Sequence, residues 1–450
     1  MSATGRLVPL GDEAPVGVGE IELTEPLPDL TQARHGGPAW TQVLVLVRLH
    51  TVPIGLVVAD VREAGLPAAE LARLVTAELS ADIEAHQRAD GLPATPLDAG
   101  GLPAAAQPAC QHDRTRVLAD APPLSVLIPT RDRAGTLGRC LDSILACHYA
   151  VDRREIVVID NVPRDDSTRA LVDDYARRGL PVRYAREDSP GSASARNRGL
   201  EVVDNELLVF TDDDAYPDAW WLAELATRFV AEPDAGAVTG MLLPRELDTQ
   251  PQLWFEQYGG FSRGFEPRRF TTARASDPGN RLYPYSAGVF GTGNNMAFRR
   301  SALVAVGGFD PALGNGTPAL GGVDSEVLLR TVLSGQALAY EPRALVWHSH
   351  RADYDGLRRQ IYSYGTGLTA YLAKTLWQNP HLLGDFLRRV PEGARFALSS
   401  SSEKNSRKTS TYPRDLTWAE RRGMVHGLLA YPRSRRKYGP HRTPRAVRPR

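Results

Sequence analysis

Apolar and polar positions near the start of the chain follow two different patterns. From Trp40, the run TQVLVLVRLHTVPIGLVVADV is almost continuously apolar and β-branched, which predicts two strands around a Pro-Ile-Gly turn. The next run, PAAELARLVTAELSADIEAHQRA, places its apolar residues at helical spacing. Residues 39–90 are therefore predicted to form a small α+β module.

The segments on either side of this module lack both patterns. Residues 1–38 are rich in Pro, Gly and acidic residues and are predicted to form a loosely ordered arm. Residues 91–120 are dense in Pro, Gly and Ala, which is typical of a linker. The next folded unit is therefore expected to begin near residue 121.

Beyond the linker, short apolar strands alternate with amphipathic helices. Strands are predicted at 124–129, 155–160 and 206–211, each followed by a helix. This βαβ series predicts an α/β fold with a mainly parallel central sheet and flanking helices. Past residue 241 the strands become less regular, and further helices are predicted near 298–305, 322–334 and 353–377.

Composition places the chain among ordinary globular proteins. Hydrophobic residues make up 42% and charged residues 24%, and no apolar run reaches the roughly 18 residues that a bilayer span needs. The first 20 residues lack the pattern of a signal peptide, which predicts a cytoplasmic protein. Cys110, Cys140 and Cys147 lack CxxC spacing, which argues against a disulfide scaffold or a zinc site and favours reduced structural thiols.

The formal net charge of zero hides an uneven distribution. Residues 403–450 hold 14 Lys and Arg against 3 Asp and Glu. We predict that residues 378–450 form a basic, partly disordered extension. A solvated tail is one interpretation, and a peripheral contact with the inner face of the membrane through a short amphipathic helix is the other. No nucleic-acid partner is predicted.

Polar residues follow three of the predicted strands at their carboxyl ends. They are Pro129-Thr130-Arg131-Asp132, Asp160-Asn161 and Asp212-Asp213-Asp214. In an open parallel sheet, ligands bind at this edge, so a nucleotide pocket is the natural hypothesis. Neither GxGxxG nor a P-loop follows the first strand, so another group must neutralise a diphosphate.

The acidic triplet predicts a site for a divalent cation. Asp212 and Asp214 are two residues apart after an extended strand, so their carboxylates can point to one side and share Mg²⁺ or Mn²⁺. Such an ion would also contact the two phosphates of a donor and stabilise the leaving diphosphate. A solvated turn or a helix N-cap is the alternative interpretation of three acids at this place.

Seven short motifs occur in a fixed order: SVLIPTRDR, EIVVIDN, GSASARNRGL, FTDDD, FGTGNNMAFRR, VGGFD and GGVDSEVLLR. Together they resemble the family 2 inverting glycosyltransferases of GT-A fold, over about residues 122–375, in an actinobacterial type with an added N-terminal module. The resemblance implies a GT-A domain over 121–377 that moves a sugar from a nucleotide-diphosphate sugar, with UDP favoured by its frequency in the family. The implied acceptor is a glycan, a lipid-linked molecule or a small molecule. A sugar-nucleotide-binding pseudoenzyme and a nucleotidyltransferase are the alternatives.

The resemblance also implies roles at the donor end of the site. Residues implied to bind the donor are Pro129, Thr130, Arg131, Asp160, Arg196, Asp212 and Asp213. A surface position for Arg196 and a turn position for Asp160 are the alternatives. Asp214, Asp212 and His348 are implied as metal ligands, with His350 as the alternative to His348.

At the acceptor end, the resemblance implies that Asp324 is the catalytic base, although Val323 replaces the usual Glu of the family's pair. Asp324 could instead be only a helix N-cap. Asn294 and Asn295 offer amides to sugar hydroxyls, with a tight structural turn as the alternative. Glu326 is expected to orient the acceptor or to replace Asp324 as the base.

Overall fold

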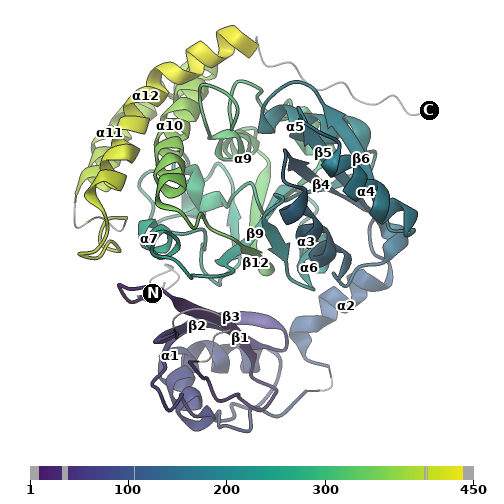
Figure 1. Cartoon of the computed structure of the whole chain (residues 1–450), viewed down its shortest axis with the longest axis vertical. Coiled ribbons are helices and arrows are strands. Elements are labelled where there is room, and N and C mark those ends of the chain that lie inside the picture. The colour runs from purple at the N-terminus through teal and green to yellow at the C-terminus, as the bar shows by residue number, and fades with distance from the viewer. Residues whose placement is uncertain (1–9, 33–38, 106, 400–401, 403, 439–450) are drawn as a thin grey trace.

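The computed structural model describes residues 10–32, 39–105, 107–399, 402 and 404–438. Figure 1 shows a small N-terminal module beneath a larger domain, with a short helix running between them and the C-terminal helices along one side of the domain.

The N-terminal module is a three-stranded sheet with one long helix. Its elements are β1 (Val16–Glu22), β2 (Gln42–Leu49), β3 (Val52–Asp60) and α1 (Ala68–Ala89). β1 pairs with β2 in parallel, and β2 pairs with β3 in antiparallel fashion. The predicted α+β class of this module is therefore what the structure shows.

Strand β2 is buried on both faces, which explains its continuous apolar run. Val43, Val45 and Val47 pack in the module's own core, together with residues of α1. Leu44 and Leu46 instead join the hydrophobic core of the larger domain. The module is thus packed directly on that domain.

Three boundary predictions are wrong in the described residues. The predicted arm contains β1, whose glycines weaken the strand signal and whose pairing with β2 only the fold supplies. The predicted turn at Pro53-Ile54-Gly55 lies inside β3, and the chain reverses instead at His50 and Thr51, both at positive φ. The predicted linker contains η1 (Ala109–Gln111) and α2 (His112–Ala119).

The larger domain is built on one mixed sheet with the order β10-β12-β9-β11-β7-β4-β5-β6, and β8 pairs with β12. Its strands are β4 (Leu124–Thr130), β5 (Arg154–Asn161), β6 (Val182–Glu187), β7 (Leu207–Phe210), β8 (Ala215–Pro217), β9 (Ala235–Pro244), β10 (Arg268–Phe270), β11 (Met296–Arg299) and β12 (Ala337–His348). The pairings make β4, β5, β6, β7, β9 and β12 run in one direction, and β8, β10 and β11 in the other. The predicted α/β fold with a mainly parallel sheet is confirmed.

Helices cover both faces of this sheet. They are α3 (Ala134–Leu145), α4 (Ser167–Arg177), α5 (Ser192–Val202), α6 (Trp221–Ala231), α7 (Gln250–Tyr258), α8 (Arg300–Ala305) and α9 (Val323–Leu333), with short turns η2 (Val151–Arg153), η3 (Arg274–Ser276) and η4 (Ala287–Phe290). Residues of α3, α4 and α6 pack with Val126 and Ile128 of β4, whereas residues of α5 and α9 share a core with Leu127. The alternation along β4 therefore sorts the helices into two layers.

The C-terminal helices form an outer layer beside the sheet (Figure 1). They are α10 (Tyr354–Gln378), η5 (Pro380–Leu382), α11 (Leu383–Leu398) and α12 (Arg414–Tyr438). Glycines let α10 and α12 touch, since a Cβ on Gly365 would lie 2.1 Å from the backbone oxygen of Glu420. The predicted basic extension therefore contains helices over 383–398 and 414–438, while residues 400, 401, 403 and 439–450 lie outside the described part.

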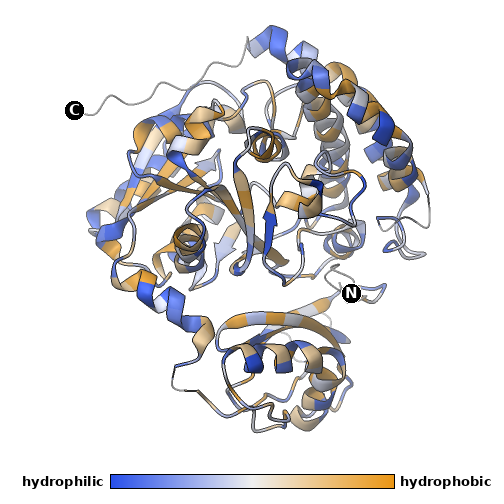
Figure 2. Cartoon of the chain, turned by 180° about the vertical axis from the view of Figure 1, so that it is seen from behind, coloured by the Kyte–Doolittle hydropathy of each residue, from blue (hydrophilic) through white to orange (hydrophobic). Residues whose placement is uncertain are grey.

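Figure 2 shows hydrophobic residues along the strands of the central sheet and alternating hydrophobic and hydrophilic residues on the outer helices. Within the described residues, no helix combines the length and the apolar character that crossing a membrane requires.

Candidate active site

The parallel strands bring their carboxyl ends to one edge of the sheet, and a cavity of about 2250 Å³ opens there. Thr130 from β4, Asn161 from β5, Asp212 after β7 and His348 from β12 all line it. Ligand sites commonly occupy about 300–1000 Å³, so this cavity has room for two substrates at once.

Asp213 and Asp214 are buried and share one arginine. Asp213 accepts hydrogen bonds from Thr130 Oγ1 and from Arg133 Nη1, both at 2.6 Å, and Arg133 Nη1 also reaches Asp214 Oδ2 at 3.0 Å. Burial raises the pKa of Asp213 to about 7, although Arg133 opposes this. Burial acts on Asp214 too, but His348, Arg133 and Arg351 outweigh it and hold the pKa of Asp214 below its ordinary value. Asp214 is the member of the pair that stays ionised.

Asp212 is the most exposed carboxylate of the triplet, with 31% of its side chain accessible. Arg196, from α5, donates to Asp212 Oδ1 at 3.1 Å and is itself 5% exposed. The alternative of a surface arginine at position 196 is therefore wrong. A buried guanidinium beside a half-open carboxylate gives this corner of the cavity both charges that a diphosphate and its cation need.

His348 and His350 differ in what they face. His348 lines the cavity, with Nε2 3.6 Å from Asp214 Oδ1, while its Nδ1 lies 3.1 Å from Nδ1 of His350. The Nε2 atom of His350 is 2.8 Å from Glu256 Oε1, so Glu256 already occupies the second nitrogen of this ring. Metal-binding histidines are commonly held through their second nitrogen in this way. The donor set of two carboxylates and one supported imidazole therefore fits a divalent cation.

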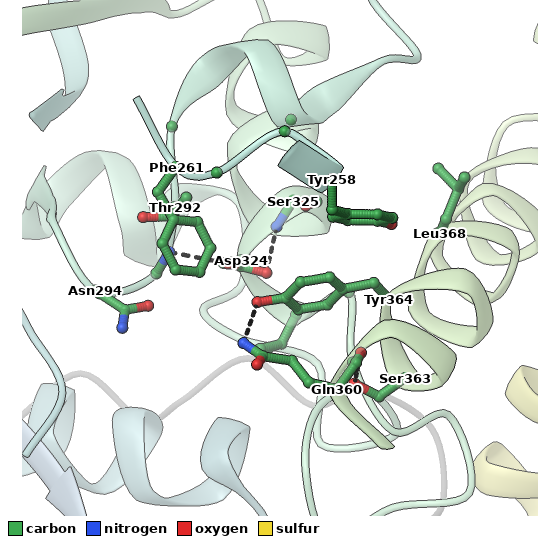
Figure 3. Close-up of a pocket in the computed structure, with 18 of the residues that line it drawn as sticks. Tyr258, Phe261, Thr292, Asn294, Asp324, Ser325, Gln360, Ser363, Tyr364 and Leu368 are labelled. Carbon is green, nitrogen blue, oxygen red and sulfur yellow. Dashed lines mark hydrogen bonds between the residues drawn. The ribbon is translucent and has the colours of Figure 1, made fainter. Parts of the chain in front are cut away.

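Asp324 enters the cavity from the first turn of α9 (Figure 3). Its Oδ2 accepts a hydrogen bond from Gly293 N at 2.9 Å, and its Oδ1 accepts one from Ser325 N. A Cβ on Gly293 would lie 3.1 Å from both Arg196 Nη2 and Asp324 Cβ. Only the bare backbone of Gly293 therefore separates Asp324 from the arginine that holds the triplet.

Aromatic side chains form the wall beside Asp324. Figure 3 shows Tyr258, Phe261 and Tyr364 around this part of the cavity, with Leu368 of α10 next to them. The rings of Tyr258 and Tyr364 are stacked, 6.3 Å apart, and the Tyr364 hydroxyl accepts a hydrogen bond from Gln360. Aromatic faces with polar edges are suited to the apolar faces and hydroxyls of a sugar.

Two residues expected at the acceptor end do not line the cavity. Asn295 is fully buried, and its amide bonds Trp221 Nε1, Met241 O and Ala344 O, so it joins strands and a helix. Glu326 is also buried, and its carboxylate pairs with Arg330 and Lys374, each at 2.8 Å. Both serve the fold, whereas Asn294 does line the cavity.

The residues expected to bind the sugar donor differ in how far they are exposed to the cavity. Pro129 and Arg131 line the cavity, but 45% of the Arg131 side chain is exposed and its partner is Asp132, 3.7 Å away. Asp160 is completely buried at the end of β5, where Tyr184 donates to Oδ2. Its Oδ1 has no hydrogen-bond partner within the described residues.

Sequence reasoning missed Arg133, Arg351 and the aromatic wall. Arg133 stands two residues beyond Arg131 in the same TRDR motif, and nothing in the spacing says which arginine turns toward the triplet. Arg351 lies 3.8 Å from Asp214 and follows the WHSH motif directly. The wall comes from α7, the loop after it and α10, which only the fold brings together.

Residues 125–307 match the family model "Glycosyl transferase family 2". Three curated relatives illustrate the range of the similarity. A glucosyl-dolichyl phosphate glucuronosyltransferase of Haloferax volcanii is 24% identical over 52% of this chain and 72% of its own length. A pre-mycofactocin glycosyltransferase of Mycobacterium tuberculosis is 27% identical over 54% of this chain. A validoxylamine A glucosyltransferase of Streptomyces hygroscopicus is 39% identical over 26% of this chain and 28% of its own length.

The matched part of the mycobacterial relative is 46% of its length, so the chain spans about half of that protein. Among solved structures, a mannosyltransferase of Pyrobaculum calidifontis, in complex with GDP-Man and Mn²⁺, aligns with a TM-score of 0.45 at 20% identity, covering 71% of this chain and 88% of that one. TarS of S. aureus aligns with a TM-score of 0.41 at 16% identity, covering 71% and 93%.

Proposed function

We propose that this chain, whose residues 125–307 match the family 2 glycosyltransferase model, moves one sugar from a nucleotide-diphosphate donor to an acceptor hydroxyl by a metal-assisted single displacement with inversion. The observation that carries this proposal is the position of Asp324, which shares one cavity with the acidic triplet and is separated from Arg196 by Gly293. In-line displacement requires a base and a leaving-group site that face one shared space, and Asp324 and the triplet line the same cavity.

The donor end would hold the diphosphate. Asp212, Asp214 and His348 would bind Mg²⁺ or Mn²⁺, which neutralises the phosphates and the charge of the leaving group. Arg196 and Arg133 add fixed positive charge at the same corner and keep the carboxylates in place. Arg351 supplies a third cation beside Asp214.

The acceptor end would supply the proton transfer. The acceptor hydroxyl gives its proton to the Asp324 carboxylate while its oxygen forms the new bond to the anomeric carbon. The bond from that carbon to the diphosphate breaks, and the diphosphate leaves with the electron pair. Asp324 is pre-oriented because the amides of Gly293 and Ser325 hold both of its oxygens.

We propose uridine as the nucleoside of the donor. Asp160 neighbours Thr130 in the register of β4 and β5, and its buried Oδ1 lacks a hydrogen-bond partner in the described part of the chain. The N3–H group of a uracil ring, which thymine also carries, would donate to such an oxygen. Thermal-shift measurements with UDP-, GDP- and dTDP-sugars, each with and without Mn²⁺, test this choice, and stabilisation by GDP-sugars alone or by dTDP-sugars alone contradicts it.

Replacing Asp324 tests the mechanism. Asp324→Asn keeps the shape of the side chain and can keep only one of the two hydrogen bonds from Gly293 N and Ser325 N. It cannot accept the proton, so kcat should fall by about 10³-fold with donor affinity unchanged. Asp204→Asn, at an exposed position outside the cavity, is the matched control and should keep full turnover. Full turnover of Asp324→Asn would assign the base elsewhere.

We further propose that α12 rests on an anionic membrane surface, where a lipid-linked acceptor would be presented. Trp418, Val425 and Leu429 are 61%, 71% and 59% exposed and repeat at helical spacing on one face. Arg422, Arg433 and Arg436 are exposed on the same face, so cations flank the apolar side chains. Arg422 also lines the cavity, which supports a membrane contact close to the site.

Flotation with vesicles tests the membrane contact. Wild-type protein should float with vesicles that contain phosphatidylglycerol and not with phosphatidylcholine alone. Val425→Ser with Leu429→Ser should weaken flotation by about tenfold, because two apolar side chains are lost from the contact. Val230→Ser removes a valine of α6 that is 47% exposed, away from the proposed contact, and should change nothing. Flotation unaltered by the double substitution contradicts the proposal.

A further inference from the structure

Four potential metal ligands meet in the N-terminal module, far along the chain from the acidic triplet. They are His50, His86, Asp90 and Cys110, and one ligand atom from each lies within 4.8 Å of all the others. A zinc ion bound tetrahedrally by nitrogen, oxygen and sulfur needs its ligands roughly 3.3–3.8 Å apart. Small side-chain shifts would therefore close this cluster around an ion.

Asp90 stands at the centre of the cluster. Its Oδ2 lies 2.7 Å from His50 Nδ1 and 3.2 Å from His86 Nε2, and its side chain is 1% exposed. The Nε2 atom of His86 is buried and makes no hydrogen bond within the described residues, although it points at this carboxylate. Cys110 Sγ lies 3.9 Å from His50 Nδ1 and completes the set.

The backbone around the cluster is held in place by other residues. His50 and Thr51 form the turn between β2 and β3 with φ of 56° and 69°, and their amides donate to the two oxygens of Glu22. Asp90 Oδ1 accepts a hydrogen bond from Cys110 N at 2.6 Å. Since these contacts fix the backbone at His50, Asp90 and Cys110, the cluster is largely preformed.

We infer that these four side chains form a structural zinc site. Two neutral imidazoles, one carboxylate and one thiolate give a charge of −2, which balances Zn²⁺, and four protein ligands make a closed site without a position for substrate. Binding releases the proton of the Cys110 thiol to solvent, because the thiolate is the ligand. The cysteine spacing, which lacks CxxC, does not reveal this site, since three of its four ligands are not cysteines.

The site would link the module to the glycosyltransferase domain. His50 belongs to the β2–β3 turn, His86 and Asp90 to the end of α1, and Cys110 to η1, which leads into α2. Arg343 of β12 donates to the backbone oxygen of Cys110 at 3.1 Å. An ion here therefore ties three segments of the module to the point at which the chain enters the larger domain.

Cobalt substitution of the full-length chain tests the inference without any activity assay, so its outcome is independent of the proposed function. The metal-free protein is titrated with Co²⁺, followed by Zn²⁺ as the competitor. Of the Co²⁺ that the wild type binds, about one equivalent should give visible bands of tetrahedral geometry and a near-ultraviolet thiolate-to-cobalt band, and Zn²⁺ should abolish both. Co²⁺ at the proposed site of the acidic triplet has no thiolate ligand and gives no such thiolate band.

Cys110→Ser should lose the thiolate band, and His86→Ala should weaken cobalt binding by more than about 100-fold. His112→Ala removes an exposed imidazole close by, and Cys147→Ala removes a buried thiol of the larger domain, so both should keep the wild-type spectrum. Absence of a thiolate band in the wild type, which needs no variant to fold, overturns the inference. Persistence of the band in Cys110→Ser does so as well.

Discussion

The cavity edge of the large sheet and the contact between the module and the domain both bury charged side chains, but they use them differently. At the cavity edge, Asp213 and Asp214 share Arg133, and Asp212 remains partly exposed to an open space. At the module contact, Arg114 pairs with Glu224 at 2.8 Å, both buried, and its guanidinium lies 3.8 Å from the Trp220 ring. Charges left partly open indicate a ligand site, whereas charges closed on one another hold two parts of the fold together.

Removing a carboxylate from the cavity edge should give the largest effect. Asp214→Asn takes away a proposed carboxylate ligand of the cation, so turnover should fall by about 10³-fold or more, and added Mn²⁺ should no longer stabilise the donor complex. Activity and donor-dependent thermal shifts measure this. The thiolate-to-cobalt band of the module should be unchanged in the same variant, and its loss would show that the two regions are not independent.

The fold and the general position of the site can be predicted from the sequence, because the periodicity of apolar residues and the residues at strand ends are local signals. The alternation beyond residue 121 predicts the sheet, and Thr130, Asp212 and Asp324 meet in the cavity as expected. Roles that depend on distant partners could not be predicted. Glu326 is separated from Lys374 by 48 residues along the chain, and this ion pair turns its carboxylate away from the cavity.

The N-terminal region shows the same limit. The pattern of residues 39–90 predicts strands and a helix, but the glycine-rich β1 gains its place only by pairing with β2. In the sequence, His50 is a single polar residue inside an apolar run. Its proximity to His86, Asp90 and Cys110 depends on the position of the turn between β2 and β3. The sequence predicts elements well and the contacts between them poorly.

The module contact should give a smaller, pH-dependent effect. Burial, and then the nearby charge of Glu224, raises the pKa of Glu341 on β12 to about 7 from an ordinary value of 4.5. The folded state therefore holds a proton that the unfolded state releases, so stability should decline as pH rises from about 4.5 to 7, by up to roughly 3 kcal/mol. Glu341→Gln should flatten this decline.

Urea unfolding at pH 5 and pH 7.5 measures the difference between wild type and Glu341→Gln. Glu13→Gln, at an acidic position outside the buried contact, is the control and should keep the wild-type slope. An identical pH dependence in Glu341→Gln would mean that the module contact tolerates an ionised carboxylate. The module contact and the cavity edge would then not differ in how they hold buried charge.

The smallest effect should separate the two arginines of the TRDR motif. Arg133 contacts Asp213 and Asp214 directly, so Arg133→Ala leaves the triplet with excess negative charge, and the donor KM should rise by about tenfold. Arg131→Ala removes a side chain that is 45% exposed and lies 3.7 Å from its acidic partner, so KM should change by less than about twofold. Raising Mn²⁺ should recover part of the Arg133→Ala loss, because the cation offsets the same charge. Equal KM values for the two variants would show that donor binding at the triplet does not depend on Arg133. The bound cation alone would then offset the negative charge of the triplet.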